Sequence, residues 1–246
     1  GTRSPTAAGG IASWAYRSSD SSNFASSIFT NGSATTMALE LTDNSTLAVL
    51  TDGEGVASAA GLAGMSYEPS SSSFITTSGN TSMTLRLASG SNLTVSGGGS
   101  GGGGNAVVTV GGMASGARTG TSTIITNATS TTNMTLQLTE SSKLRVSGGG
   151  DYSAVSVVGM AGWAAASSIT ASGNSTMNLQ LTQRSVLTAT GDGSHVAVAA
   201  AGAGSISVST TYPTTLSTTI TATGCLLMHA QMTYGSTVDV LAAGTS

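Results

Sequence analysis

Hydrophobic residues alternate with polar ones, two residues apart, in a block that returns five times along the chain. The block reads Met-x-Leu-x-Leu-Thr-x-x-Ser-x-Leu-x-Val, with drift in the last copy. Successive copies lie 46, 51, 43 and 51 residues apart, and they begin at Met37, Met83, Met134, Met177 and Met228. A period of two is typical of a half-buried strand. Repetition at this spacing is typical of solenoids, propellers or arrays.

The unit that begins at Met83 predicts four short strands. The first contains Met83, Leu85 and Leu87, and the second contains Leu93 and Val95 after a Ser-Gly-Ser corner. Residues 106–110 and 123–126 form the third and the fourth. Equivalent fourth strands are marked by Ile28, Ile75, Ile125, Ile169 and Ile220. No segment shows a sustained apolar period of 3.6 residues, so we expect almost no helix.

Shifting the chain by half a repeat superposes the Met-x-Leu-x-Leu strand on the third strand, which predicts two coils per unit. The expected fold is therefore all-β, a parallel β-helix or β-solenoid of about ten coils built from five ~48-residue repeats. It would form a single elongated repeat domain over residues 1–246. A five-bladed β-propeller and an antiparallel β-sandwich are the alternatives.

Stacking of the repeats predicts two columns of equivalent residues. Leu39, Leu85, Leu136 and Leu179 would form an internal column. Glu40, Arg86, Gln137, Gln180 and Gln231 would form an outward polar column. With two coils per unit, the outward residues would lie about 10 Å apart, too far to contact one another directly.

Composition excludes several classes of protein. Charged residues make up 7% of the chain and hydrophobic residues 39%, at a net charge of −3, which is not the balance of a disordered tract. The acidic pI of about 5.1 provides no basic surface for nucleic acid. No apolar run approaches the ~20 residues of a membrane span. Because the chain starts at Gly1 inside a repeat, we expect a piece of a longer or assembled structure.

The acidic residues lie mostly in corners and form no carboxylate cluster, so we expect no enzymatic activity and no catalytic, metal or cofactor site. Asp52 and Glu54 are the densest acidic pair. His195 and His229 belong to different repeats, without metal-ligand spacing. A threonine column of the kind that orders water on ice-binding solenoids would contain Thr76, Thr126, Thr170 and Thr221.

Three residue types leave two interpretations open. Trp14 and Trp163 occur in the related stretches GIASW and GMAGW. Their rings either pack in the core or serve as flat surfaces on which a sugar stacks. Cys225 is the single cysteine, so it is either a corner residue or an interchain bridge. Seven sequons would be corner residues or glycosylation sites, at Asn31, Asn44, Asn80, Asn92, Asn127, Asn133 and Asn174.

The run Asn-Ser-Thr-Met-x-Leu-x-Leu-Thr-x-x-Ser-x-Leu-x-Val, with glycines after it, resembles the repeats of parallel β-helix surface proteins. Autotransporter passengers and filamentous adhesins are examples of this style. The resemblance covers most of the chain and implies an extracellular, cell-surface or virion-surface rod.

We therefore expect a non-enzymatic structural or adhesive protein that self-associates into a fibre, spike or surface layer. Its partners would be further copies of itself, as a trimer or a filament, and glycans or a host or cell surface. A phage or virus fibre or capsid-decoration protein is the alternative. A carbohydrate-active enzyme and an ice-binding protein are further alternatives.

Overall fold

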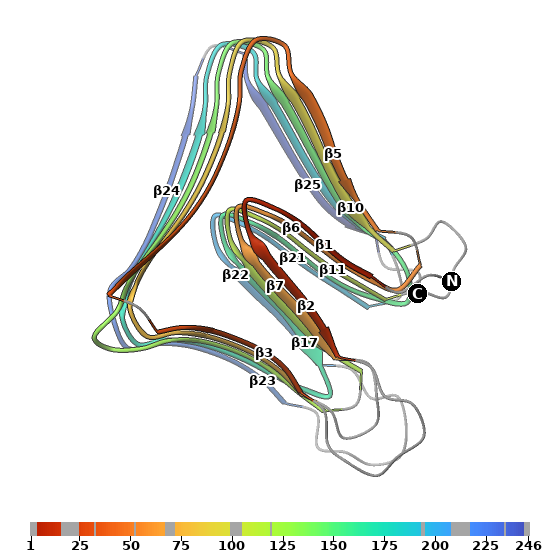
Figure 1. Ribbon diagram of the computed structural model, residues 1–246, viewed down its shortest axis with the longest axis vertical. Coiled ribbons are helices and arrows are strands. Elements are labelled where there is room, and N and C mark those ends of the chain that lie inside the picture. Colours follow the sequence, from red (N-terminus) through yellow and green to blue (C-terminus); the bar gives the residue numbers. More distant parts are fainter. Residues whose placement is uncertain are drawn as a thin grey trace.

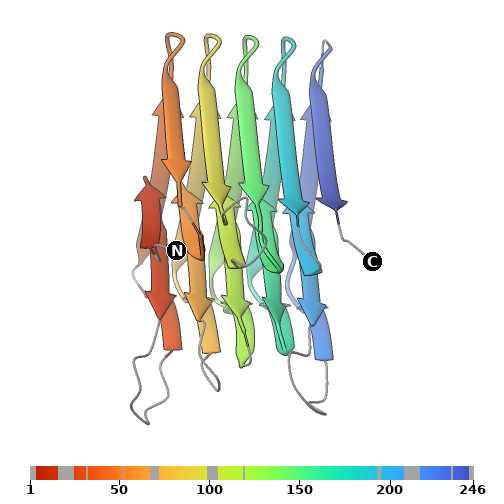
Figure 2. The same cartoon turned by 90° about the vertical axis from the view of Figure 1, so that its right-hand side faces the viewer.

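The computed structural model is a parallel β-solenoid in which every repeat forms one coil (Figures 1 and 2). It describes residues 4–15, 25–31, 33–51, 53–66, 72–98, 105–118, 120–192, 195–207, 217–233 and 235–243. These residues contain 25 strands and no helix, as the sequence predicted. The strands form five sheets of five parallel strands, and each sheet takes one strand from every coil.

We name each sheet by its first strand. The β1 sheet contains β1 (Ser4–Ala8), β6 (Gly55–Ala59), β11 (Asn105–Val110), β16 (Tyr152–Val157) and β21 (His195–Ala200). The β2 sheet contains β2 (Ile11–Ala15), β7 (Leu62–Ser66), β12 (Met113–Ala117), β17 (Met160–Ala164) and β22 (Ala203–Ser207). The β3 sheet contains β3 (Ala25–Thr30), β8 (Ser72–Thr77), β13 (Thr121–Thr126), β18 (Ala166–Ala171) and β23 (Ser217–Ala222).

The two remaining sheets carry the repeated motif. The β4 sheet contains β4 (Ala34–Leu41), β9 (Asn80–Leu87), β14 (Thr131–Leu138), β19 (Asn174–Leu181) and β24 (Leu226–Met232). The β5 sheet contains β5 (Thr46–Leu50), β10 (Asn92–Gly97), β15 (Lys143–Gly148), β20 (Val186–Asp192) and β25 (Thr237–Ala243).

The predicted number of about ten coils is wrong, because a coil is a whole repeat and the stack has five. Met83 pairs with Met134, one full repeat away, rather than with Ala106, half a repeat away. Ala106 pairs instead with Gly55 and Ser153, its equivalents in the neighbouring repeats. Parallel pairing within every sheet also excludes the propeller and the antiparallel sandwich, whose neighbouring strands would run in opposite directions.

Each coil folds part of its length inward as a narrow hairpin of two strands, one from the β1 sheet and one from the β2 sheet (Figure 1). The β3, β4 and β5 sheets form the outer walls around this hairpin. Strands β6, β7, β11 and β12 are buried throughout. Burial on both faces is normal for a parallel sheet covered from both sides. Here each sheet of the hairpin is covered by the other hairpin sheet on one face and by the outer walls on the other, in place of helices.

The strands of the β2 sheet are the elements that the sequence did not predict. Met113-Ala-Ser-Gly-Ala forms β12, although glycine and alanine have low strand propensity. The strand persists because it is packed between two other sheets, where small side chains fit. The predicted first to fourth strands of the same unit are confirmed as β9, β10, β11 and β13.

The core consists of two apolar clusters. The larger one gathers inward side chains of all five sheets, among them Met83, Leu85, Val95 and Ile75, all fully buried. The predicted leucine column is confirmed in register. The smaller cluster lies inside the hairpin, where Trp163 packs with Met65 and other side chains. Burying each large apolar side chain contributes about 1.5–3 kcal/mol, so uninterrupted columns stabilise the whole stack.

Buried hydroxyl groups join neighbouring coils at the corner between the β3 and β4 sheets. The oxygens of Thr30 and Thr81 lie 2.9 Å apart, and those of Thr77 and Thr132 lie 3.2 Å apart. Each pair links one coil to the next. These contacts satisfy polar groups whose burial without a partner would be unfavourable.

The isoleucine column differs from the prediction by one residue. Ile28, Ile75, Ile124, Ile169 and Ile220 are in register and point inward, so Ile124 takes the place expected for Ile125. Ile125 lies in the outward column with Thr76 and Thr170, which interrupts the predicted threonine column. Thr126 is buried. The error is a one-residue slip at an Ile-Ile pair, which exchanges the two faces of a strand.

A column of glycines runs through the tips of the inner hairpins. Gly10, Gly61, Gly112 and Gly159 each face the carbonyl oxygen of the equivalent glycine in the next coil, and a Cβ would lie 2.4–2.6 Å from that oxygen. The residue before each glycine has positive φ, from 49° at Ala201 to 62° at Gly9. The tip is therefore a turn in which only glycine allows the next coil to approach.

The Thr-x-x-Ser part of the motif forms the corner between the β4 and β5 sheets. The two central residues have positive φ, as at Glu140 (55°) and Ser141 (63°). The serine hydroxyl donates to the carbonyl oxygen three residues earlier, as from Ser142 to Thr139 at 2.6 Å. Equivalent serine bonds occur in all five coils. The serine is repeated because it satisfies the backbone of a tight corner.

Replacing Gly159 by alanine should lower the free energy of unfolding by about 3 kcal/mol, because the new Cβ would meet the backbone of Gly202. Gly202→Ala is the matched control in the same column, where the nearest atoms lie 3.7 and 3.8 Å from the Cβ position. It should change stability by less than about 1 kcal/mol. Urea unfolding of dilute protein measures both variants. Equal effects would contradict the stacking of the glycines.

Replacing Ser142 by alanine should lower the free energy of unfolding by about 1 kcal/mol, because the buried corner loses a hydrogen bond to the Thr139 carbonyl. Ser141→Ala is the control, since that exposed hydroxyl makes a contact of 3.4 Å at the surface. Thermal unfolding should show a lower midpoint for Ser142→Ala alone. A larger loss for Ser141→Ala would show that the hydroxyl is not what holds the corner.

Candidate functional site

The C-terminal end of the stack exposes side chains whose equivalents in the three middle coils are buried. Ile220 is 49% exposed, whereas Ile28, its equivalent in the first coil, is 4% exposed. Met228 is 53% exposed against 6% for Met37. Val240 is also exposed, at 42%, and Met232 at 46%. We call Ile220, Met228, Met232 and Val240 the apolar end face.

The two ends differ because each coil is covered mainly by the next coil along the chain. In the first coil, Ile28, Met37 and Val49 are buried although no described coil precedes them, while Leu39, Leu41 and Leu47 are half-buried and Ile11 is 40% exposed. In the fifth coil, which no described coil follows, the equivalents of the three buried residues are 42–53% exposed. Strands β21 to β25 also have no strand on their far side within the described residues. The end therefore combines apolar side chains with unpaired backbone groups, which favours pairing with another strand.

A ladder of polar side chains runs along the outer face of the β4 sheet. Arg86 pairs with Glu40 at 2.9 Å, Gln137 donates to Gln180 at 3.2 Å, and Gln180 donates to Gln231 at 3.4 Å. The prediction that these residues lie too far apart to contact is wrong. Their separation is one coil, about 4.8 Å, because each repeat supplies one coil and not two.

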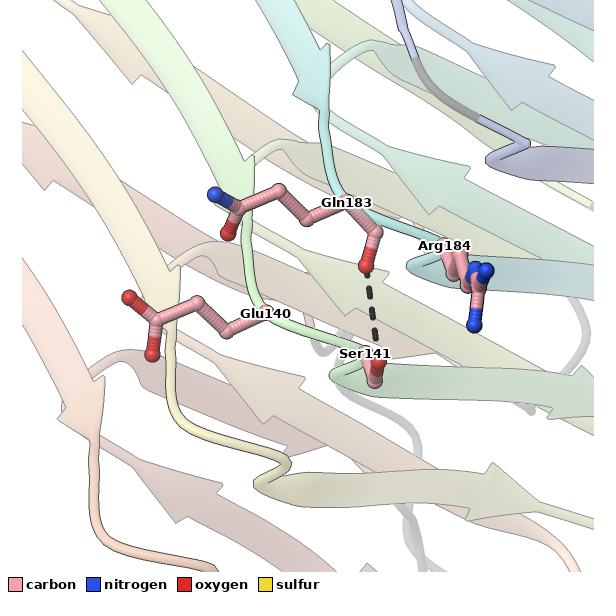
Figure 3. Close-up of a pocket in the computed structure, with 4 residues that line it drawn as sticks. All are labelled: Glu140, Ser141, Gln183 and Arg184. Carbon is pink, nitrogen blue, oxygen red and sulfur yellow. Dashed lines mark hydrogen bonds between the residues drawn. The ribbon is translucent and has the colours of Figure 1, made fainter.

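A shallow hollow of about 270 Å³ lies at the corner between the β4 and β5 sheets (Figure 3). Glu140, Ser141, Gln183 and Arg184 line it. The side chains of Glu140 and Gln183 run side by side, while Arg184 points away from both. Ser89 of the preceding coil donates to the Glu140 carboxylate at 2.9 Å. These are contacts between stacked corners, and they form no enclosed site.

A second hollow, of about 250 Å³, lies on the outer face of β4, β9 and β14. Its lining consists of small polar and apolar side chains: Ala34, Thr35, Thr36, Asn80, Thr81, Ser82, Thr131 and Asn133. No charged side chain contributes to it. It is a polar groove between neighbouring strands without a group suited to acid–base chemistry.

The sequons occupy two kinds of position. Five asparagines are exposed: Asn31, Asn44, Asn80, Asn133 and Asn174. Two are half-buried with their side-chain amides hydrogen-bonded, Asn92 to the Gly90 carbonyl and Asn127 to the Ser78 hydroxyl. All seven lie on outer strands or corners, and the sequence alone leaves open whether any of them carries glycan.

The other candidate residues are not brought together. Glu54 is buried, and Asp52 lies outside the described residues. His229 is exposed on the outer face of β24. Among the described residues, no group of three or more His, Cys, Asp or Glu side chains could hold a metal ion.

The two tryptophans belong to the core, which decides between the interpretations left open. Trp14 and Trp163 lie in the same column of the β2 sheet, with Met65 and Gly116 between them. Trp163 is 1% exposed and stacks on Tyr152, with ring centroids 5.3 Å apart. A Cβ on Gly116 would lie 2.4 Å from the indole nitrogen, so this glycine makes room for the ring.

Cys225 is a free, exposed thiol directly before β24, the last strand of the β4 sheet. It continues the outward column of Ala34, Asn80, Thr131 and Asn174. The sequence predicted this column correctly. It did not reveal that the cysteine lies beside the apolar end face, because the number of coils was wrong.

No protein-family model, no curated protein and no solved structure matches the chain. The described residues include no helix long and apolar enough to cross a membrane.

Replacing Met228 by alanine should cost less than about 1 kcal/mol in isolated molecules, because half of that side chain is already in water. The same change at Met177, one coil earlier in the same column and fully buried, should cost about 2–5 kcal/mol. Denaturant unfolding at low protein concentration compares them. Equal costs would show that the end is covered within a single molecule.

Proposed function

We propose that the chain is a structural repeat segment without enzymatic activity, which associates with further copies of itself into a fibre or surface layer. The apolar end face carries this proposal. Four core-type side chains at 42–53% exposure, beside five strands whose far edges have no partner among the described residues, are an unfavourable surface to leave in water. Association through such a surface removes apolar area from water at about 25 cal/mol per Å².

The uniform stack supports a mechanical role. Neighbouring coils are joined by parallel pairing in all five sheets, by continuous apolar columns and by hydroxyl pairs. Each coil contacts mainly its neighbours, so stability grows with the number of stacked coils. A rod of this kind gains from lengthening, which self-association provides.

We further propose that the protein is extracellular or located on a cell surface. The alternative is that it forms part of a virion surface. The chain has seven lysine and arginine residues in total, so it offers few sites to trypsin-like proteases. Those at Arg86, Lys143 and Arg145 lie within paired strands. Adhesion through the polar outer faces, to glycans or to a host surface, belongs to the same proposal.

Sedimentation velocity and negative-stain electron microscopy of the purified chain test self-association. The mean mass should rise with protein concentration, and particles should be multiples of one molecule. A chain that stays monomeric from micromolar to near-millimolar concentration would overturn the proposal. Turnover of a polysaccharide by the purified chain would overturn the non-enzymatic part.

A further inference from the structure

We propose that molecules join head to tail: the C-terminal coil of one copy receives the first coil of a second copy as its next coil. This inference rests on the proposed self-association and names its surface and partner. The occupant of the apolar end face is then strands β1 to β5 of another molecule. The contact would repeat the coil-to-coil interface that already occurs four times within the chain.

The exposure of the two ends is complementary. No described coil covers Ile220, Met228 and Val240 of the fifth coil, which are exposed. Their equivalents in the first coil, Ile28, Met37 and Val49, are already buried, although Ile11 of that coil is 40% exposed. Joining the ends places Ile28, Met37 and Val49 one step beyond Ile220, Met228 and Val240 in the same columns. In each column, one apolar residue then lies next to another, as it does inside the molecule.

Gly202 supplies an independent argument. In each preceding coil, the glycine of this column faces the carbonyl of the next glycine at 2.4–2.6 Å from its Cβ position. At Gly202 the space is open, with Met228 Sδ 3.7 Å away. The last coil thus keeps the shape that admits a further coil. In a head-to-tail contact, the carbonyl of Gly10 of the second copy would occupy that space.

The polar ladder is complementary in the same direction. Its amides donate toward the C-terminus, from Gln137 to Gln180 and from Gln180 to Gln231. The next acceptor in the series would be the Glu40 carboxylate of the second copy. Asp239 would face Ala48, its equivalent in the first coil. Among the described residues of the two coils, no like charges would be stacked.

Such a contact joins two different surfaces and therefore does not close on itself. A heterologous contact leads to an open filament when its rotation does not form a ring. In-register stacking adds a translation of about 4.8 Å per coil, so each added molecule lengthens the stack by five coils. The tail-to-tail alternative would pair two C-terminal edges antiparallel, unlike every strand pair in the fold.

Cross-linking through Cys225 tests the direction of the contact. In a head-to-tail joint, Cys225 lies next to Ala34, and in-register neighbours on parallel strands are about 4.8 Å apart, within the Cα range of a disulfide. Ala34→Cys should give a ladder of covalent dimers, trimers and longer species on oxidation or with a short thiol cross-linker. Reducing agent should collapse the disulfide ladder.

Two controls define the outcome. Ala48→Cys places an exposed thiol on β5 of the same coil but in another column, and it should give no ladder. The unaltered chain, with Cys225 alone, should give no covalent product. A cross-linked dimer of the unaltered chain would indicate a tail-to-tail joint, and equal ladders from both cysteine variants would indicate random collisions. Either result overturns the head-to-tail proposal.

Gly202→Ala tests the interface itself without disturbing a buried position of the monomer. The new Cβ would meet the Gly10 carbonyl of the second copy, so assemblies and the Ala34→Cys ladder should both be lost while the unfolding midpoint is kept. If Gly202→Ala still assembles like the unaltered chain, self-association stands and the head-to-tail surface is wrong. If the unaltered chain never assembles, the proposed function fails as well.

Discussion

Parallel stacking in register governs every other feature of this fold. Every strand of a coil lies beside its own equivalent in the next coil, one repeat away. Like side chains therefore lie above like side chains, which produces methionine, leucine and isoleucine columns inside and an amide ladder outside. Single-residue requirements are repeated for the same reason: the glycine at each hairpin tip and the serine at each corner recur because each coil presents the same space to the next.

The infolded hairpin fills the interior of each coil. A coil of about 48 residues encloses more space than one layer of side chains can fill, and the β1 and β2 sheets fill it from within (Figure 1). Small residues are needed where the two sheets meet the outer walls, as at Gly64, where serine hydroxyls of the β3 sheet lie 3.1 Å from the Cβ position. The larger Trp163 is accommodated by Gly116 in the neighbouring coil. A stack of this kind has two ends that differ, and the proposed function is based on that difference.

Local patterns in the sequence were sufficient to predict the strands of the β4 and β5 sheets, their corners and the columns of equivalent residues in the five repeats, because a two-residue apolar period and a fixed corner serine are local signals. They did not predict which strands are direct neighbours, since the half-repeat shift paired Met83 with Ala106 instead of Met134. They also placed Cys225 in its correct column and matched the stretches around Trp14 and Trp163, which are equivalent in the structure. The packing of the folded chain was needed to show that one repeat is one coil, that glycine-rich segments such as Met113–Ala117 are strands, and which core residues lie uncovered at the end. Alternation shows which face of a strand is buried, but not which segment buries it, because that choice depends on how all five sheets pack together.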